Sequence, residues 1–520
     1  MTQLVLLPVI LPLLGAGLCL AFGRSARAQR IISIAVLVAV VAVAAVLLWR
    51  ADTQGPQAVN VGGWPVEIGI SLVADRLSAL LLLVSTLVTL TVLLYSFGQG
   101  IVEFGRDTPL SVFYPTFLVL SAGVSSAFLS ADLFNLFVAF EVLLVASYVL
   151  ITLGGTEARV RAGTIYVIVG LISSALFLIT IACVYAAAGT VNLAELPERL
   201  ADLPEPTRLV LQLMLLVTFA IKAAIFPLSA WLPDSYPTAP APVTAVFAGL
   251  LTKVGVYAII RTQTLVFDGD ALRTLLLVAA VLTMVVGILG AVAQSDIKRM
   301  LSFTLVSHIG YMLFGVALGT EAGYSGAIFY VVHHITAQTA LFLVAGLIEY
   351  RTGTTQLDRL GGLARGTPVL AVLFLVPALN LAGIPPFSGF LGKLALIQAG
   401  SMPGDALAYV AVGAAVASSL LTLYAVAKAW NRAFWQPAED EAPEGHDRRP
   451  GSMHEGQTSS SPEISSLRLP RGMALPTLAL VGLSVGITFV AGPLLGITDR
   501  AATDLLERTP YIEAVLGEDR

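Results

Sequence analysis

Long apolar runs recur along the whole chain and constrain its fold more than any other feature. Each is close to 20 residues long, the length that an α-helix needs to cross the hydrocarbon core of a bilayer. The runs begin near Leu4, Ile31, Val73, Leu110, Leu133, Thr164, Leu209, Val243, Leu272, Met300, Ser325, Thr367, Ala406 and Met473. The sequence therefore predicts an all-α, polytopic membrane protein with about 14 transmembrane helices.

Composition supports this class and argues against several others. Hydrophobic residues make up 57% of the chain and charged residues only 12%, whereas soluble proteins carry roughly 25% charged residues. No basic cluster suggests nucleic acid, and Cys19 and Cys183 lie too far apart in sequence to suggest a disulfide framework or a metal site. No nucleotide-binding, zinc-hydrolase or Ser/His/Asp motif is present, so we expect no cofactor and no enzymatic chemistry. The first run lacks a basic leader, so it is expected to be a retained helix.

Basic residues in the short loops predict how the chain crosses the membrane. They are Arg24, Arg27, Arg30, Arg159, Arg161, Lys298, Arg299, Arg351, Arg359 and Arg365. All fall on one side if each apolar run crosses once, and the positive-inside rule places that side in the cytoplasm. Both termini would then lie outside. Residues 436–470 are rich in Pro, Ser, Gly, Glu and Arg and are expected to form a flexible cytoplasmic loop, and an acidic tail follows the last helix.

Ionisable side chains inside the apolar runs are the strongest functional signal. They are Glu141, Lys222, Lys253, His308, His333, His334 and Lys393. A lysine at membrane depth costs ~2.5–3.5 kcal/mol on insertion scales, so such residues usually face a polar pathway. One alone could instead be a structural ion pair or a histidine bonded to a carbonyl. A row of them is a costly way to fix packing, because the attraction in buried pairs often fails to offset desolvation. We interpret the row as an ion path.

Prolines interrupt two of these runs beside a lysine. In residues 218–253, Pro227 follows Lys222, and four more prolines precede Lys253. A proline inside a helix removes a hydrogen bond and kinks the chain. Such backbone is tolerated at membrane depth only inside protein or beside a water-filled cavity. The segment therefore indicates a broken helix next to a polar cavity, with Glu141 as the expected partner of Lys222.

The second break carries Pro385 and Pro386, ahead of Lys393. Pro385 leaves the carbonyl of Leu381 without its helical donor, and Pro386 does the same to Ala382. Freed carbonyls can hold water or coordinate a cation. In each half of the chain a buried titratable residue thus precedes, by two helices, a lysine on a broken helix. This faint duplication is typical of a transporter path.

Polar residues at the helix ends have simpler interpretations. Asp132 and Asn135 are expected to cap the start of a helix rather than to transport ions. Asp75 and Arg76 lie at the mouth of the third run and are expected to be interfacial.

Four segments together resemble one family of membrane proteins. They are SADLFNLFVAFEVLLVASY, IKAAIFPLSAWLPDSYPTAPAPVTAVFAGLLTKVGVYAIIR, QSDIKRMLSFTLVSHIGYM and NLAGIPPFSGFLGKLALIQ. They resemble the antiporter-like subunits shared by respiratory complex I, membrane-bound hydrogenases and Mrp-type multisubunit Na⁺/H⁺ antiporters. The resemblance covers helices four to thirteen. Within the family, the run LTKVGVYAIIRTQTLVF and the end of the chain soon after its last helix are most similar to the D-type subunits of Mrp antiporters.

The resemblance implies two inverted repeats of five helices, each with one discontinuous helix. The expected division is 1–109 for the first three helices, 110–264 and 265–435 for the two repeats, 436–470 for the loop, and 471–520 for the last helix and tail. The implied proton path follows the membrane midplane through Glu141, Lys222, Lys253, His308, His334 and Lys393, with helix breaks at Pro227, Pro385 and Pro386. Many relatives carry a lysine on helix eleven where this chain has Gln338, so His334 is expected to carry protons there.

The expected function is proton translocation within a multisubunit antiporter that exchanges a monovalent cation, Na⁺ above all, for H⁺. The resemblance implies a bacterial cell membrane and partner membrane subunits, among them a larger A-type and a small C-type subunit. Two alternatives remain. The chain could be a proton-pumping subunit of a complex I-like oxidoreductase or a membrane-bound hydrogenase, or a scaffold that does not transport.

Overall fold

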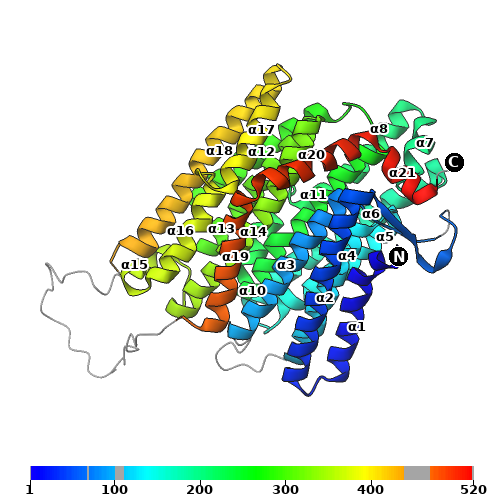
Figure 1. The fold of residues 1–520 in the computed structure, drawn as a ribbon. Coiled ribbons are helices and arrows are strands. Elements are labelled where there is room, and N and C mark those ends of the chain that lie inside the picture. The colour runs from blue at the N-terminus through cyan, green and yellow to red at the C-terminus, as the bar shows by residue number, and fades with distance from the viewer. Residues whose placement is uncertain (1, 67–68, 100–109, 438–468, 518–520) are drawn as a thin grey trace, which may run out of the picture.

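Long helices packed side by side form a single bundle in the computed structural model (Figure 1). The structure describes residues 2–66, 69–99, 110–437 and 469–517. The helices of the first half are α1 (Leu7–Ala21), α2 (Ala26–Gln54), α3 (Arg76–Gln99), α4 (Leu110–Leu129), α5 (Leu133–Thr152), α6 (Glu157–Ala188), α7 (Leu196–Ala201), α8 (Glu205–Ala223), α9 (Trp231–Ser235), α10 (Ala241–Val246) and α11 (Thr252–Arg261). Those of the second half are α12 (Arg273–Ala293), α13 (Ile297–Ala317), α14 (Glu321–Thr352), α15 (Leu363–Gly366), α16 (Pro368–Ala382), α17 (Ser388–Ser401), α18 (Ala406–Trp430), α19 (Arg471–Phe489), α20 (Ala491–Glu507) and α21 (Thr509–Leu516).

Thirteen helices within these described ranges are long and apolar enough to cross a membrane. The all-α, polytopic class expected from the apolar runs is therefore confirmed. The run that begins near Thr367 is split, because α16 is only 15 residues long and α17 follows it after the Pro385–Pro386 pair. The expected loop 436–470 lies outside the described residues, except for its first two and last two positions.

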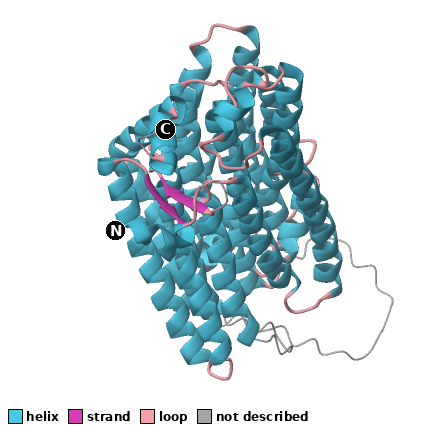
Figure 2. Cartoon of the chain, turned by 90° about the vertical axis from the view of Figure 1, so that its right-hand side faces the viewer, coloured by secondary structure: helices cyan, strands magenta, loops and turns pink. Residues whose placement is uncertain are grey.

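One small hairpin interrupts the helical pattern. Strands β1 (Gln57–Asn60) and β2 (Ser71–Ala74) pair antiparallel, with Gln57 opposite Ala74 and Asn60 opposite Ser71. Figure 2 shows the hairpin in magenta against the helices, on the same side of the bundle as the N-terminus. It joins α2 to α3 and leads directly into Asp75 at the mouth of α3.

Side-chain caps explain where several spans begin. An N-cap side chain accepts a hydrogen bond from a first-turn N–H group that has no helical partner. Asp132 does so for α5, with its Oδ1 atom 2.5 Å from the amide nitrogen of Asn135, as the sequence predicts. Asn135 is not itself a cap, because its side chain donates to the hydroxyl of Ser130 at 2.8 Å. Asp296 and Asp405 cap α13 and α18 in the same way as Asp132.

The acidic tail expected after the last span is instead two further helices. Figure 1 shows α20, in red, running across the bundle rather than along it. Asp504 on α20 binds Arg76 at 2.5 Å, and Arg500 binds Asp52 of α2 at 2.7 Å. The charges of this segment therefore bind the end of the bundle.

Asp75 is also placed differently from expectation, because it is buried rather than interfacial. Its Oδ2 atom lies 2.8 Å from Nη1 of Arg261, and its Oδ1 atom lies 2.9 Å from Nη2 of the same guanidinium. Burial alone would raise the pKa of Asp75. The charge and hydrogen bonds of Arg261 outweigh that effect and hold the pKa below its usual value. The pair joins the start of α3 to the end of α11.

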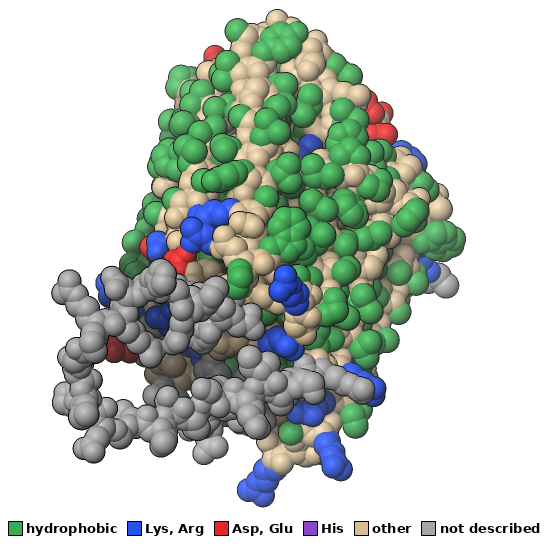
Figure 3. Space-filling view, turned by 90° about the vertical axis from the view of Figure 1, so that its left-hand side faces the viewer, with side chains coloured by type: hydrophobic (Ala, Val, Ile, Leu, Met, Phe, Trp, Pro, Cys, Tyr) green, Lys and Arg blue, Asp and Glu red, His purple; other side chains and the backbone are tan. Residues whose placement is uncertain are grey.

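The loops rich in basic residues meet at one end of the bundle. Lys298 binds Glu349 at 2.6 Å, Arg299 binds Asp234 at 2.8 Å, and the amide of Gly362 donates to the carbonyl of Gln436. Figure 3 shows one face of the molecule, on which hydrophobic side chains cover the upper part and most Lys and Arg side chains gather in the lower half. An apolar belt with a basic end is the surface expected of a membrane-spanning bundle.

Candidate functional site

The ionisable residues singled out in the sequence lie on helices that pack around one another. Lys222 is in the last turn of α8, Lys253 in the first turn of α11, and Lys393 in α17, and each is at least 92% buried. His308 on α13 and His334 on α14 are fully buried. Glu141 on α5 differs, because it is only partly covered.

A serine joins the first two charged residues. Ser174 on α6 donates its hydroxyl hydrogen to Oε1 of Glu141, and the Nζ atom of Lys222 lies 3.5 Å from the same hydroxyl oxygen. Lys222 also lies over the ring of Phe140, 4.7 Å from its centroid. The expected partnership of Glu141 with Lys222 therefore runs through a hydroxyl group, which can both accept from the ammonium and donate to the carboxylate.

The first helix break lies directly after Lys222. Helix α8 ends at Ala223, and Ala224 adopts the left-handed conformation with φ of 57°. The amides of Ala224 and Ile225 turn back to the last carbonyls of α8, as in a common helix-ending motif. The indole N–H group of Trp231 binds the carbonyl of Ile221 at 3.1 Å. The chain thus leaves the helix at membrane depth with polar groups satisfied inside the protein.

Lys253 follows a bulge in the next helix. Residues Phe247–Leu251 form a π-helical turn between α10 and α11. A π-turn disturbs the regular i to i−4 ladder and often marks a functional site. The Nζ atom of Lys253 donates to the carbonyl of Ala248 at 2.6 Å. Gly255 packs α11 against the first break, because a Cβ atom there would lie 2.7 Å from the amide nitrogen of Ala223.

Two histidines and a tyrosine form the centre of the second half. The Nδ1 atom of His308 lies 2.9 Å from the hydroxyl of Tyr330, and its Nε2 atom lies 3.5 Å from the hydroxyl of Thr422. The rings of His308 and His334 are 5.1 Å apart. Neither ring nitrogen of His334 has a hydrogen-bond partner among the described residues. The Nζ atom of Lys393 lies 5.0 Å from the ring centroid of Tyr311, which is 5.5 Å from that of His308.

Lys393 occupies the second helix break. Its Nζ atom lies 3.1 Å from the carbonyl oxygen of Leu381 and 3.0 Å from that of Ala382. These are the two carbonyls that the following prolines deprive of helical donors. The hydroxyl of Ser419 accepts a third hydrogen bond at 3.1 Å. The break therefore holds the amine end of the chain's own lysine.

A second group of polar side chains forms hydrogen bonds between this break and the helices α14 and α19. Nδ1 of His333 lies 3.0 Å from the hydroxyl of Ser388, and Asn380 accepts from the amide of Gly389 at 2.8 Å. The Nδ2 group of Asn380 donates to Ser484 on α19 at 2.6 Å. His333, adjacent to His334 in sequence, thus contacts the start of α17, whereas His334 faces His308.

Gln338 on α14 is fully buried. Its Nε2 group donates to the carbonyl of Leu301 on α13 at 2.7 Å. Its Oε1 atom has no hydrogen-bond partner among the described residues. The side chain therefore has one unbonded oxygen atom in this region, and, unlike a lysine, it has no group that takes up a proton.

The structure thus brings the predicted residues together in two groups. Glu141 and Lys222 form one, and His308, His334 and Lys393 the other, with Lys253 on the helix between them. The sequence interpretation missed the hydroxyls that connect them, above all Ser174 and Tyr330. Within the described parts of the chain, no set of three His, Cys, Asp or Glu side chains is arranged to hold a metal ion.

Known proteins resemble this chain over most of its length. The sequence model of the family described as NADH:quinone oxidoreductase/Mrp antiporter, TM, matches residues 130–422. The D-type subunit of the Na⁺/H⁺ antiporter of Alkalihalophilus pseudofirmus is 38% identical over 521 residues, which cover 100% of both chains.

Solved structures give the same result. A chain of the Mrp complex from Dietzia sp. DQ12-45-1b is 35% identical, with a TM-score of 0.88 over 99% of both chains. A chain of the membrane-bound sulfane sulfur reductase, an archaeal respiratory membrane complex, is 25% identical, with a TM-score of 0.86 over 99% of this chain and 100% of that one. The chain therefore belongs to the NADH:quinone oxidoreductase/Mrp antiporter family, and within it to the D-type subunits of Na⁺/H⁺ antiporters.

Proposed function

We propose that this chain is the proton-translocating subunit of a multisubunit Na⁺/H⁺ antiporter. The observation that carries the proposal is the set of ionisable groups near two helix breaks, whose lysines bond to hydroxyls and carbonyls rather than to carboxylates. Protons would pass along Glu141, Lys222, Lys253, His334, His308 and Lys393. The names of its relatives support Na⁺ as the exchanged cation.

In this mechanism the pair of Glu141 and Lys222 acts as a gate. The attraction between two unlike charges weakens as the distance between them grows, and here the hydroxyl of Ser174 spans that distance. A protonated Lys222 therefore holds the carboxylate of Glu141 through Ser174. Transfer of the proton to Lys253 would remove that attraction and free Glu141. The chain would move ions without covalent chemistry of its own.

The second group would carry the proton onward. The His334 ring has two nitrogens free of partners among the described residues, and its centroid lies 5.1 Å from that of His308. Imidazole can take up a proton on one nitrogen and release it from the other, which suits such a position. Lys393, held by Leu381 and Ala382, would receive the proton at the second break. The repeats at 110–264 and 265–435 would each contribute one break.

Partner subunits would complete the path. Glu141 is partly exposed, and its neighbours Phe134 and Val145 are 50% and 57% exposed on the same helix. A carboxylate next to lipid is unfavourable, so an adjoining membrane subunit is expected to cover this face of α5. A larger A-type and a small C-type subunit are the candidates that the family resemblance implies.

The basic end of the bundle supports an orientation in a bacterial cell membrane. The positive-inside rule would place that end in the cytoplasm and both termini outside. A reporter fused after residue 517 would be protected from external protease in the opposite orientation and accessible in this one.

A second candidate function, a proton-pumping subunit of a respiratory enzyme, is suggested by a relative of lower identity. The identities of 38% and 35% with antiporter subunits, against 25% with the respiratory one, favour exchange. The subunits that copurify with the chain discriminate, since a respiratory complex would bring iron–sulfur subunits with it. A scaffold without transport would tolerate loss of the buried charges.

The test is Na⁺-driven proton movement in everted vesicles that contain the whole complex. We expect Glu141→Ala and Lys222→Ala to abolish exchange while the complex still assembles. Asp358→Asn serves as the control, because Asp358 lies 60% exposed at the basic end, paired with Arg432. Normal exchange by both path variants would refute the proposal.

A further inference from the structure

A small cavity beside Lys222 carries an inference that rests on the proposed function and deepens it. We propose that this cavity holds water and supplies Lys222 with protons from the basic end of the bundle, with the hydroxyl of Tyr236 as the group that holds the water. Tyr236 is thereby a further relay residue of the path.

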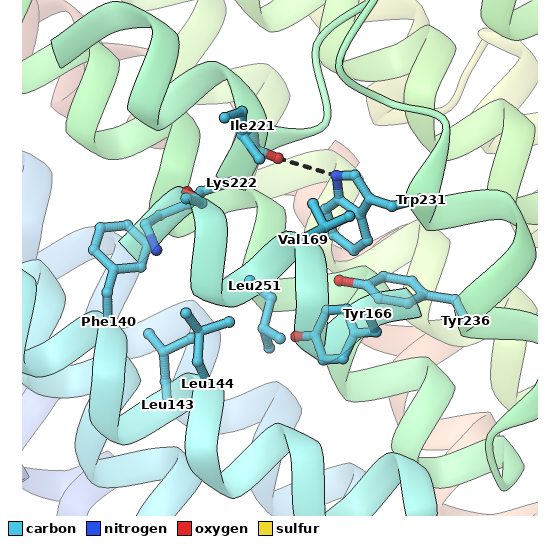
Figure 4. Close-up of a pocket in the computed structure, with 12 residues that line it drawn as sticks. Phe140, Leu143, Leu144, Tyr166, Val169, Ile221, Lys222, Trp231, Tyr236 and Leu251 are labelled. Carbon is cyan, nitrogen blue, oxygen red and sulfur yellow. Dashed lines mark hydrogen bonds between the residues drawn. The ribbon is translucent and has the colours of Figure 1, made fainter. Parts of the chain in front are cut away.

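The cavity lies between α5, α6, α8 and the segment that follows the first break. Its volume is about 30 Å³, the share of one water molecule in the liquid and more than the minimum that a buried water requires. Aromatic rings form much of its wall, namely Phe140, Tyr166, Trp231 and Tyr236. Figure 4 shows Lys222 on one side of it and the two tyrosines on the other.

Most polar groups around the cavity are already bonded. The indole of Trp231 donates to Ile221, and the hydroxyl of Tyr166 lies 2.8 Å from that of Ser147. The hydroxyl of Tyr236 is the exception. The residue is fully buried, and its oxygen has no hydrogen-bond partner among the described residues.

A buried hydroxyl without a protein partner is rare, and water usually satisfies it. In Figure 4 the hydroxyls of Tyr236 and Tyr166 both point toward the side of the cavity where Leu251 and Lys222 lie. A water molecule in the cavity would give the hydroxyl of Tyr236 the partner that it lacks. The aromatic wall would keep other ions out, because it offers them no carboxylate or carbonyl ligand.

In this proposal the proton route to the cavity starts at the basic end of the bundle. A surface hollow of about 650 Å³ is lined by Glu157, Arg161, Asp234 and Thr238. The hollow and the inner cavity are lined by different residues of the same two segments, α6 and the stretch after the first break. On α6, Ile165 lines the hollow and the next residue, Tyr166, lines the cavity. In the segment after the break, Asp234 and Thr238 line the hollow on either side of Tyr236. Tyr166 and Tyr236 thus belong to the two segments that border both spaces.

The titratable groups around the cavity are few, and each can be assigned to an element. Lys222 comes from α8, Tyr166 from α6 and Tyr236 from the turn after α9, while Glu141 of α5 reaches Lys222 through Ser174. The next helix contributes only Leu251 to the wall. Among the described residues, Lys222 is therefore the one basic side chain that lines this cavity.

The first test is hydroxyl-radical footprinting of the intact, purified complex by X-ray radiolysis, which oxidises side chains in contact with water. Tyr95 is the matched control, because it is equally buried but donates to the carbonyl of Leu343 away from the cavity. We expect Tyr236 to be oxidised at least several-fold faster than Tyr95. Equal rates would overturn the hydrated cavity.

The second test is the variant Tyr236→Phe, which removes the hydroxyl and keeps the ring. Everted vesicles expose the cytoplasmic face, and we expect exchange to fall about tenfold or more, because a proton-transfer group contributes at least that much. The deficit should shrink when the outer face of these vesicles is acidified, and Tyr95→Phe should exchange normally. An unchanged rate in Tyr236→Phe would overturn the relay role, and so would a deficit that does not respond to that pH.

The two proposals fail in different ways. Normal exchange by Glu141→Ala and Lys222→Ala overturns the proposed function, whereas the oxidation contrast between Tyr236 and Tyr95 needs no exchange activity. If exchange depends on Lys222 but Tyr236 is oxidised no faster than Tyr95, the proposed function stands. The cavity is then overturned as the proton supply.

Discussion

Replacement of Ser174 by alanine is the sharpest perturbation of the first half of the path. The hydroxyl of Ser174 binds both Glu141 and Lys222, and the structure shows no direct ion pair between these two among the described residues. A hydrogen bond to a charged group contributes about 1.5–3 kcal/mol. At 1.36 kcal/mol per tenfold change in rate, loss of one such bond from the transfer step corresponds to a decrease of roughly 10- to 150-fold.

The assay is the initial rate of Na⁺-driven proton movement in everted vesicles with equal amounts of assembled complex. Ser174→Thr keeps the hydroxyl and is expected to stay within a few-fold of the native rate. Thr180→Val is the control for a lost hydroxyl on the same helix, because Thr180 bonds only to the carbonyl of Leu176 in its own helix. A native rate in Ser174→Ala would refute the bridging role, as would equal losses in Ser174→Ala and Thr180→Val.

Two further predictions concern the bundle itself. Asp75→Asn leaves the guanidinium of Arg261 buried without its partner charge, and we expect a loss of about 3–5 kcal/mol in the free energy of unfolding, measured by thermal melting in detergent. The pKa of Asp75 is lower in the folded chain than in the unfolded one. The pair therefore stabilises the fold fully at a pH above the unfolded-state pKa of about 3.9, and this stabilisation is lost as the pH falls through the folded-state pKa. The variant should lack this dependence on acid. Gly255→Ala places a Cβ atom 2.7 Å from the amide nitrogen of Ala223, so we expect it to separate α11 from the first break, with a stability loss of about 1–3 kcal/mol and slower exchange. An unshifted melting temperature would contradict either prediction.

The charged residues of the site could be predicted from the sequence because they differ in polarity from the apolar residues around them. A lysine such as Lys253 stands out in an apolar run, and the chemistry of proline identifies the carbonyls of Leu381 and Ala382 as the ones that lack helical donors. The structure places Lys393 on those two carbonyls.

Hydroxyl groups carry no such contrast. Serine and threonine are common in membrane helices and usually bond to a carbonyl of their own helix, as Thr180 does. Nothing in the sequence distinguishes Ser174 from it. Tyr236 is hidden for a related reason, because a buried tyrosine usually has a partner and only the fold reveals that this one lacks it among the described residues.

Long-range pairs also escape sequence interpretation. Asp75 and Arg261 lie on different helices, 186 residues apart in the chain, and each resembles an ordinary residue at a helix end. The alternating charges after α19 suggest exposure to solvent, so the sequence predicts an acidic extension there. Its helices instead bury apolar side chains such as Leu505 against the bundle, and Arg76 and Asp52 bind their charges.

The most direct measurement of the central claim is the effect of Lys253→Met on exchange by the purified complex in proteoliposomes. Lys253 is fully buried on the helix between the two groups of charged residues, and methionine preserves its length without its charge. If the two groups form one continuous path, this variant should lose Na⁺-driven proton movement while the complex keeps its full set of subunits. Exchange at the native rate would contradict the account, because protons would then cross without passing the centre of the row.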